Sequence, residues 1–268
     1  SEENRFEVIA LRHEDADCAD AEGVRKALKA SRPQVVINAA AYVRVDDAED
    51  HAEEAFRVNA LGALNVARAC AEINALCVYV STDYVFDGAK DAPYVESDTP
   101  NPINVYGASK LAGEILVRQA APRWLIVRVA SLFGKTGARG KGGNFIETIL
   151  GKAKSGEPLK IVSDVQISPT YTRDAARAML NLIEHGRAGM VHLANTGACT
   201  WYGFAEEALR LAHLQGPIEP VSSNDYPYRA RRPRNSALAS EYMPRPLRPW
   251  QDALAAYLAE KGHITSST

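Results

Sequence analysis

Tyr106 and Lys110 stand four residues apart in the run YGASK, which follows the turn TPNPINV. In a helix this spacing places both side chains on one face. An ammonium group beside a phenol can stabilise the phenolate and lower the tyrosine's pKa, so that the tyrosine can pass a proton to a carbonyl oxygen. A tyrosine and a lysine at this spacing also occur as a solvated pair on an exposed helix, so the pair alone does not decide the chemistry.

A second polar group follows an apolar run. Ser81, Thr82 and Asp83 come directly after LCVYV, upstream of Tyr106. Open α/β sheets bind ligands at the carboxyl ends of their strands. If LCVYV is such a strand, Thr82 is placed to hydrogen-bond the same carbonyl oxygen as Tyr106. The two motifs together favour carbonyl chemistry over a solvated surface pair.

The elements that must position these residues alternate along the first half of the chain. Short β-rich runs and longer amphipathic runs follow one another as strand, helix, strand, helix, strand, helix and strand, at residues 6–11, 22–31, 34–40, 51–73, 76–82, from 106, and 124–131. Continuously apolar runs such as VVIN and CVYV are typical of a parallel sheet covered by helices on both faces. We therefore predict an α/β fold with a doubly wound parallel sheet.

The pattern changes after Ser131. A glycine-rich stretch at 134–143 precedes a helix at 144–156, a strand at 159–163, a helix at 172–186 and a strand at 190–195. Seven prolines within 217–250 exclude long helices there, and a last helix is expected from Trp250 to Lys261. We expect a first domain over 1–131 and a smaller mixed α/β lobe over 132–268, some elements of which return to the first domain.

A glycine-rich turn of the kind that receives a dinucleotide pyrophosphate does not precede the first predicted strand. The glycines of 134–143 follow the fourth strand, where a flexible loop is the simpler interpretation and a phosphate cradle the other. Either the first βα unit of a Rossmann-like domain is missing from this chain, or the protein does not hold a dinucleotide in the usual way.

Charge and composition exclude several classes of protein. The chain has 31 Lys and Arg against 33 Asp and Glu, a net charge of -2, which argues against a nucleic-acid partner. No apolar run of about 18 residues is present, so we expect no membrane partner and a soluble, cytoplasmic protein. The four cysteines and six histidines lack the spacing of metal ligands, and we therefore expect no metal site.

Five segments resemble the dTDP-4-dehydrorhamnose reductases, which belong to the extended short-chain dehydrogenases. The segments are 35–50, 56–69, 80–114, 143–150 and 231–238, and the most specific part runs from STDYVFDG to YGASKLAGE. The resemblance implies reduction of the 4-keto group of dTDP-6-deoxy-L-lyxo-4-hexulose to dTDP-L-rhamnose. It implies a dTDP-sugar as partner and NADPH as cofactor, with NADH also open. A homodimer is expected only because homodimers are common among soluble enzymes.

The resemblance also implies roles for individual residues. Tyr106 is the general acid, Lys110 lowers its pKa and holds the nicotinamide ribose, and Thr82 orients the keto oxygen. Asp83 contacts the sugar. Three residues of the second lobe are expected to shape the sugar-nucleotide site, with the arginine, preferred over its neighbour Arg234, as a planar partner for the diphosphate: Asn144, Gln166 and Arg232.

The remaining expected residues lie near the cofactor. Three small residues follow a predicted strand and let the cofactor approach the backbone, although alanines there also suit helix packing: Ala39, Ala40 and Ala41. Asp17 and Cys18 match positions near the adenine. Arg12 stands where an acidic residue would accept hydrogen bonds from the ribose hydroxyls, and it can pair with a 2′-phosphate instead. This favours NADPH, unless Arg12 is simply solvated in a polar loop.

Other functions remain open. Leu132 stands where some family members have a tryptophan against the sugar, so a reductase of another nucleotide sugar is an alternative. Nucleotide-sugar dehydratases have a glutamate where this chain has Tyr84, which argues for simple carbonyl reduction. The regulatory subunit of methionine adenosyltransferase also resembles these reductases, and a non-catalytic binding subunit is the alternative from a different class.

Overall fold

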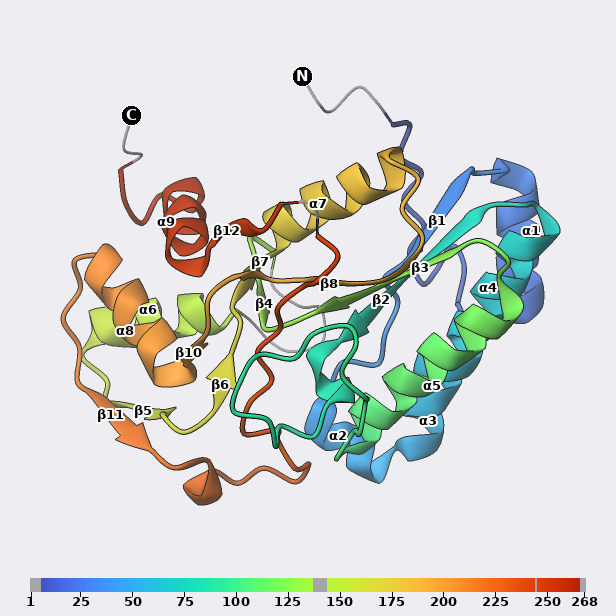
Figure 1. Ribbon diagram of the computed structural model, residues 1–268. Coiled ribbons are helices and arrows are strands. Elements are labelled where there is room, and N and C mark those ends of the chain that lie inside the picture. Colours follow the sequence, from blue (N-terminus) through green and yellow to red (C-terminus); the bar gives the residue numbers. More distant parts are fainter. Residues whose placement is uncertain (1–5, 137–143, 244, 266–268) are drawn as a thin grey trace.

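A four-stranded parallel sheet organises the first half of the molecule. The computed structural model describes residues 6–136, 144–243 and 245–265 (Figure 1). The strands lie in the order β1 (Val35–Asn38), β2 (Leu76–Thr82), β3 (Trp124–Val129) and β8 (Gly189–Leu193). Helices α1 (Ala21–Ser31), α4 (Gly62–Glu72) and α5 (Val105–Ala120) cover one face, and α7 (Thr172–Glu184) covers the other. The predicted α/β fold is confirmed.

Side-chain alternation along β2 explains why both faces need cover. Cys77 and Tyr79 point toward the cluster formed with α1, α4 and α5, whereas Leu76 and Val78 point toward the cluster formed with α7. Successive side chains of a strand point to opposite faces, so a strand that is apolar at every position must be buried on both.

The helix expected over 51–73 is interrupted. It consists of α3 (Ala52–Phe56), a π-helical turn η2 (Arg57–Leu61) and α4, and a short helix α2 (Val45–Asp50) precedes it. The π-turn holds the buried Asn59, whose side chain accepts from the Tyr42 backbone N–H at 2.8 Å and donates to Ser109 Oγ at 2.9 Å. The Asn59 carbonyl accepts from Tyr79 Oη at 2.8 Å. These tertiary bonds, which periodicity does not show, accompany the widened turn.

The strand expected over 6–11 is not formed, and this prediction was wrong. Residues 6–12 have no regular structure, and Val8 is 79% exposed. A strand needs a neighbour to pair its backbone, and within the described residues this segment has none. Strand β1 is the edge of the sheet in this part of the chain, and its Ile37 is 44% exposed.

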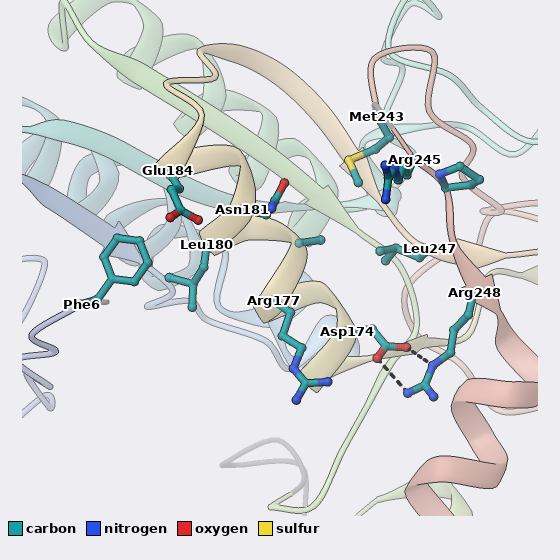
Figure 2. Close-up of a pocket in the computed structure, with 12 residues that line it drawn as sticks. Phe6, Asp174, Arg177, Leu180, Asn181, Glu184, Met243, Arg245, Leu247 and Arg248 are labelled. Carbon is teal, nitrogen blue, oxygen red and sulfur yellow. Dashed lines mark hydrogen bonds and ion pairs between the residues drawn. The ribbon is translucent and has the colours of Figure 1, made fainter. Parts of the chain in front are cut away.

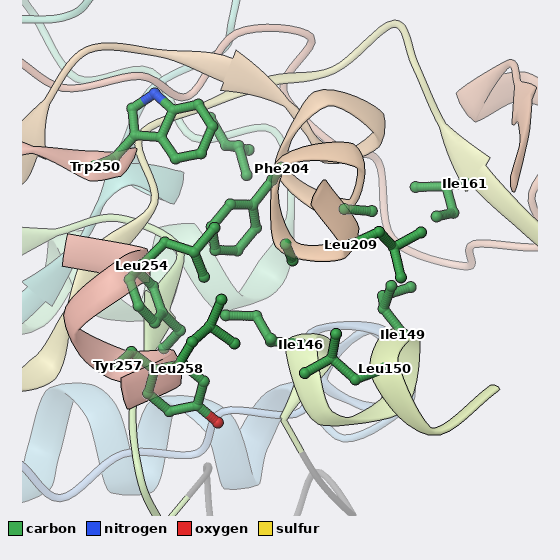
Figure 3. Close-up of a cluster of buried hydrophobic side chains, with 14 of the residues drawn as sticks. Ile146, Ile149, Leu150, Ile161, Phe204, Leu209, Trp250, Leu254, Tyr257 and Leu258 are labelled. Carbon is green, nitrogen blue, oxygen red and sulfur yellow. The ribbon is translucent and has the colours of Figure 1, made fainter. Parts of the chain in front are cut away.

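The second half packs around an apolar cluster of its own. Helices α6 (Phe145–Ser155), α8 (Trp201–Leu211) and α9 (Trp250–Glu260) surround it (Figure 3). In Figure 3 the side chains of Ile146, Phe204 and Leu254 approach one another from these three helices. The helices predicted over 144–156, over 172–186 and from Trp250 are confirmed as α6, α7 and α9.

Short strand pairs connect the second half. Strand β5 (Leu159–Val162) pairs in parallel with β11 (Ile218–Val221), which lies in the proline-rich region and was not predicted. Three further pairs have two or three residues a strand: β4 (Leu132–Phe133) with β7 (Thr170–Tyr171), β6 (Gln166–Ile167) with β10 (Cys199–Thr200), and β9 (Asn195–Thr196) with β12 (Leu247–Pro249). Residues 137–143 of the glycine-rich stretch lie outside the described residues. Of the helices described, none is long and apolar enough to span a bilayer.

Candidate active site

The end of β2 and the start of α5 meet at the carboxyl edge of the sheet. Thr82 is the last residue of β2, and Asp83 begins the short 3-10 turn η3 (Asp83–Val85). The Asn104 side chain caps α5 by accepting from the Gly107 N–H at 2.8 Å. A Cβ at Gly107 would overlap the Tyr84 carbonyl oxygen, so only glycine allows this close approach. The glycine of YGASK therefore brings Tyr106 against the polar strand end.

Tyr106 lies beside Thr82 and Asp83, as the sequence motifs predicted. Burial raises the pKa of Tyr106 to about 12, the side-chain hydrogen bond with Thr82 lowers it, and the charge of Asp83 raises it. The lowering of the tyrosine pKa by Lys110 stays a prediction, and the Lys110 Nζ itself donates to the Val80 carbonyl at 2.6 Å.

Lys110 is buried against the ring of Tyr79. Its Nζ lies 4.0 Å from the ring centroid of Tyr79 on β2. Burial lowers the pKa of Lys110 to about 7, and the negative charge of Glu114 on the same helix raises it. Lys110 thus stands near the midpoint of its titration at neutral pH, a property that YGASK alone does not reveal.

The predicted cofactor residues differ in how far they are exposed. Ala39 and Ala40 are exposed in the loop after β1, so the helix-packing interpretation of these alanines is wrong, and Ala41 follows them in the same loop. Cys18 is buried near Lys110, whose charge lowers the thiol pKa while burial raises it more strongly. These residues border the same carboxyl edge of the sheet as Thr82.

Arg12 and Asp17 lie further out. The Arg12 side chain is exposed and lies 3.6 Å from Glu14, as a solvated arginine would. The Asp17 carboxylate accepts from the Ala19 N–H at 2.9 Å and lies 3.8 Å from the Arg57 guanidinium. Neither has a described contact with Tyr106 or Lys110.

Arg232 reaches this site from the second half of the chain. Its guanidinium carbon lies 4.7 Å from the Tyr228 ring centroid and 5.9 Å from that of Tyr84, and the Tyr84 ring lies 6.0 Å from that of Tyr106. Arg232 Nη2 donates to Asp46 on α2 at 2.7 Å. Nη1 is buried and has no hydrogen-bond partner among the described atoms. The arginine therefore presents one free donor beside the Tyr84–Tyr106 pair.

Sequence reasoning missed the partners that hold Arg232. Asp46 lies in the matched block 35–50, and its Oδ1 also accepts from the backbone N–H groups of Arg229 and Ala230, both at 3.0 Å. Tyr228 precedes the matched block 231–238. Asp46 carries no local signal, because it is 186 residues from Arg232. Tyr228 lies only four residues before Arg232, in a loop that no periodic pattern predicts.

The other two second-lobe residues are placed differently. Asn144 caps α6, and its amide donates to the Gly134 carbonyl at 2.8 Å and to Tyr257 Oη at 2.9 Å. These contacts tie Asn144 to the second-half core, and none of them reaches Tyr106. Gln166 is exposed on β6, and its backbone pairs with Arg234 and Ser236 next to Arg232. Leu132 is 49% exposed.

A separate cavity of about 600 Å³ lies between α7 and residues 243 and 245–248 (Figure 2). Figure 2 shows Asp174 and Arg248 joined across it by two hydrogen bonds of 2.8 Å. None of the predicted site residues lines this cavity. Within the described chain, no group of three or more His, Cys, Asp or Glu side chains is arranged to hold a metal ion.

Curated relatives share most of the chain. The spore coat polysaccharide biosynthesis protein SpsK of Bacillus subtilis is 36% identical over 259 residues, which are 96% of this chain and 89% of that protein. The dTDP-4-dehydrorhamnose reductase of Escherichia coli is 37% identical over 238 residues, covering 84% of this chain and 77% of that protein. The resemblance found in the sequence blocks is thereby confirmed.

Solved structures agree with this relationship. The dTDP-4-dehydrorhamnose reductase of Bacillus anthracis, solved in complex with NADP, has a TM-score of 0.92 and 33% identity, covering 96% of this chain and 92% of that one. A UDP-glucose 4-epimerase of Thermus thermophilus, at 20% identity and a TM-score of 0.77, shares the fold. The profile of the RmlD substrate binding domain matches residues 1–262. The chain therefore belongs to the RmlD substrate binding domain family.

Proposed function

We propose that this protein is a dTDP-4-dehydrorhamnose reductase, which reduces the 4-keto group of dTDP-6-deoxy-L-lyxo-4-hexulose to give dTDP-L-rhamnose. The observation that carries the proposal is the hydrogen-bonded pair of Thr82 and Tyr106 at the carboxyl edge of the sheet. Several relatives at 35–38% identity carry this name. The regulatory-subunit alternative finds no support among these relatives.

The proton chemistry follows from the residues of this chain. With a pKa of about 12, Tyr106 keeps its proton at neutral pH and can donate it as a carbonyl oxygen becomes an alkoxide. The Thr82 hydroxyl orients that oxygen, and Asp83 contacts the sugar. NADPH, when bound, supplies the hydride, and the NADP-bound relative of Bacillus anthracis supports that choice of cofactor. NADH is the alternative cofactor.

The same edge of the sheet suits a dinucleotide. The small exposed side chains after β1 leave the backbone accessible, so Ala39, Ala40 and Ala41 are proposed to lie against it. Lys110 is proposed to hold the nicotinamide ribose, and Cys18 and Asp17 the adenine side. Arg12 is proposed as a partner of the 2′-phosphate, for which its exposed guanidinium is available. Residues 1–131, together with the returning elements α7 and β8, would then form the dinucleotide-binding domain.

The substrate is proposed to be held mainly by residues 132–268. The free donor of Arg232, in a buried setting between two tyrosine rings, suits one oxygen of a diphosphate. Gln166, which lies next to the Arg232 segment, is proposed to contact the sugar nucleotide. Asn144 is proposed to act by fixing the start of α6, because its amide is already bonded within the second half.

Two further proposals concern assembly and location. A homodimer would cover the exposed apolar side chains of Phe56, Leu61 and Ile115, which lie on the contacting elements α3, η2 and α5. Light scattering after size-exclusion chromatography tests it, and a monomeric mass would contradict it.

We place the enzyme in the cytoplasm, where reduced dinucleotides are held, and cell fractionation tests this.

The decisive assay mixes the purified protein with NADPH and dTDP-6-deoxy-L-lyxo-4-hexulose and follows the loss of NADPH absorbance and the formation of dTDP-L-rhamnose. The same 4-keto sugar carried on UDP is the matched control for the nucleotide, and NADH is the control for the cofactor. Binding of the dTDP-sugar without NADPH consumption would overturn the proposed reduction. Faster turnover of the UDP-sugar would assign another substrate.

A further inference from the structure

A buried carboxylate continues the line of catalytic groups along α5. Tyr106, Lys110 and Glu114 follow one another at intervals of four residues, so all three lie on one face of the helix. This face packs against β2. Glu114 is 2% exposed, as is Lys110. A carboxylate this deeply buried normally needs a charged or hydrogen-bonded partner.

Glu114 has such partners on two strands. Its Oε2 accepts from Arg128 Nη2 at 2.7 Å, and its Oε1 accepts from Arg128 Nε at 2.8 Å and from Ser81 Oγ at 2.5 Å. Arg128 and Ser81 face each other in the register of β3 and β2. Ser81 directly precedes Thr82. The carboxylate therefore joins the helix that carries Tyr106 to the strand end that carries Thr82.

The charges around this carboxylate are unevenly balanced. Arg128 is itself 2% exposed, and its Nη1 lies 3.4 Å from His192 Nε2 on β8. Burial lowers the pKa of His192, so this histidine is uncharged at neutral pH. Arg128 and Lys110 are thus two buried basic groups, and the negative charge of Glu114 pairs with Arg128 and favours the charged form of Lys110.

We propose that Glu114 is a positioning residue for carbonyl reduction, which sets the distance between Tyr106 and Thr82 through Ser81 and supplies the buried negative charge next to Lys110. The proposal rests on the function proposed above. A purely structural ion pair would be expendable, because apolar residues of similar volume often replace buried pairs without loss of stability. Here Glu114 lies on α5, which carries Tyr106, and accepts from Ser81, which directly precedes Thr82 on β2.

The proposal predicts a shift in the titration of Lys110. The groups described around its ammonium are Glu114 on α5, the Tyr79 ring and the Val80 carbonyl on β2, and Cys18 before α1. Glu114 and Cys18 favour the charged ammonium, and burial opposes it. Without the Glu114 charge the pKa of Lys110 falls further below 7, and the ammonium loses its proton at a lower pH.

Three variants test the proposal. Glu114→Gln keeps the acceptor for Ser81 and removes the charge, and the double variant Glu114→Leu with Arg128→Met removes both charges without leaving Arg128 unpaired. Ser81→Ala breaks only the link to the strand. For the two Glu114 variants we expect kcat to fall about 10- to 100-fold and KM for the sugar nucleotide to change less than about 2-fold. As the pH is raised, the kcat of these two variants should begin to fall at a lower pH than that of the parent.

Ser81→Ala should lower kcat several-fold without moving the pH profile, because the charges stay in place. In the ligand-free protein, NMR titration of ¹³C-labelled lysine, with Lys110→Met for assignment, should show a lower Lys110 pKa in the double variant. A folded double variant with parental kcat, parental pH profile and unchanged Lys110 titration would overturn the proposal. Glu114→Gln alone is not decisive if it unfolds, and the double variant then carries the test.

Tyr106→Phe, measured in parallel, separates a failure of the positioning role from a failure of the proposed function. If Tyr106→Phe is inactive and the Glu114 variants match the parent in every readout, only the positioning role fails. If the parent itself does not reduce the dTDP-sugar, the proposed function fails, and the NMR titration still decides whether Glu114 sets the charge of Lys110.

Discussion

The proposed catalytic strip of α5, which comprises Tyr106, Lys110 and the positioning residue Glu114, differs in construction from the arginine loop at residues 228–232. The strip lies on a regular helix, and its lysine and glutamate are bonded to the neighbouring strands. The arginine loop has no helix or strand of its own and is held by three side chains from the first half of the chain. Asp46 accepts from two backbone N–H groups and from the Arg232 guanidinium, Asp50 pairs with the Arg229 guanidinium, and Asn104 donates to the Arg231 carbonyl.

This difference separates the expected consequences of mutation. Groups on rigid elements keep a reacting geometry within narrow limits, whereas loops adapt to what they bind. Changes in the catalytic strip should therefore act on kcat, and changes in the arginine loop should act on KM. Variants of Tyr106, Arg232 and Asp46 test that division.

Tyr106→Phe removes only the phenolic oxygen. We expect kcat to fall by about 10²- to 10⁴-fold, the range of general acid catalysis, with little change in KM. Steady-state NADPH oxidation with the dTDP-sugar measures both parameters. The control is Tyr202→Phe, a tyrosine of α8 outside the site, which should behave as the parent. Equal turnover of Tyr106→Phe and parent would show that another group donates the proton.

Arg232→Met removes the donor that faces the Tyr84–Tyr106 pair. We expect KM for the dTDP-sugar to rise by roughly 10- to 150-fold, since a hydrogen bond to a charged group contributes about 1.5–3 kcal/mol. The kcat should change much less. Arg234→Met, two residues away, is the matched control and should leave KM near that of the parent. The opposite ranking of the two variants would reassign the diphosphate partner to Arg234.

Asp46→Asn leaves Arg232 in the chain but weakens its anchor. The amide retains one oxygen for the backbone N–H groups of residues 229 and 230, and it turns an NH₂ group toward the Arg232 guanidinium. We expect a several-fold rise in KM, near the effect of one neutral hydrogen bond, about 1 kcal/mol. Steady-state NADPH oxidation measures KM, and isothermal titration with the dTDP-sugar measures the dissociation constant beside it. A drop in kcat with unchanged affinity would break the division between the two regions.

Lys110 makes stability depend on pH. Its folded pKa, about 7, lies below the ordinary value of 10.5, so the unfolded chain binds more protons between these values. The free energy of unfolding of the ligand-free protein should therefore rise as the pH increases from about 7 to 9, by at most about 1.4 kcal/mol for each pH unit. Urea unfolding of the parent and of Lys110→Met at several pH values measures the difference. The same dependence of the unfolding free energy on pH in both proteins would contradict the lowered pKa of Lys110.

The sequence predicts the catalytic strip better than the arginine loop. Tyr106, Lys110 and Thr82 follow local patterns, a helix spacing and a strand end, and the parallel sheet follows from runs that are apolar at every position. The Asp46–Arg232 contact and the Asn59 network join distant segments, and no local pattern reports them. The segment 6–11 has a strand's composition, but a strand also needs a neighbour, which composition cannot supply.

The π-turn at Arg57–Leu61 has a consequence for the length of this helical region. Its Gly62 N–H bonds to the Arg57 carbonyl five residues back, so the turn contains one residue more than an α-helix needs. Deleting one residue inside the turn would leave α4 in phase, with its apolar face still toward the sheet. Deleting one elsewhere in α3 or early in α4 would rotate part of the helix by about 100°. A tolerated one-residue gap in this region should therefore fall at residues 57–61.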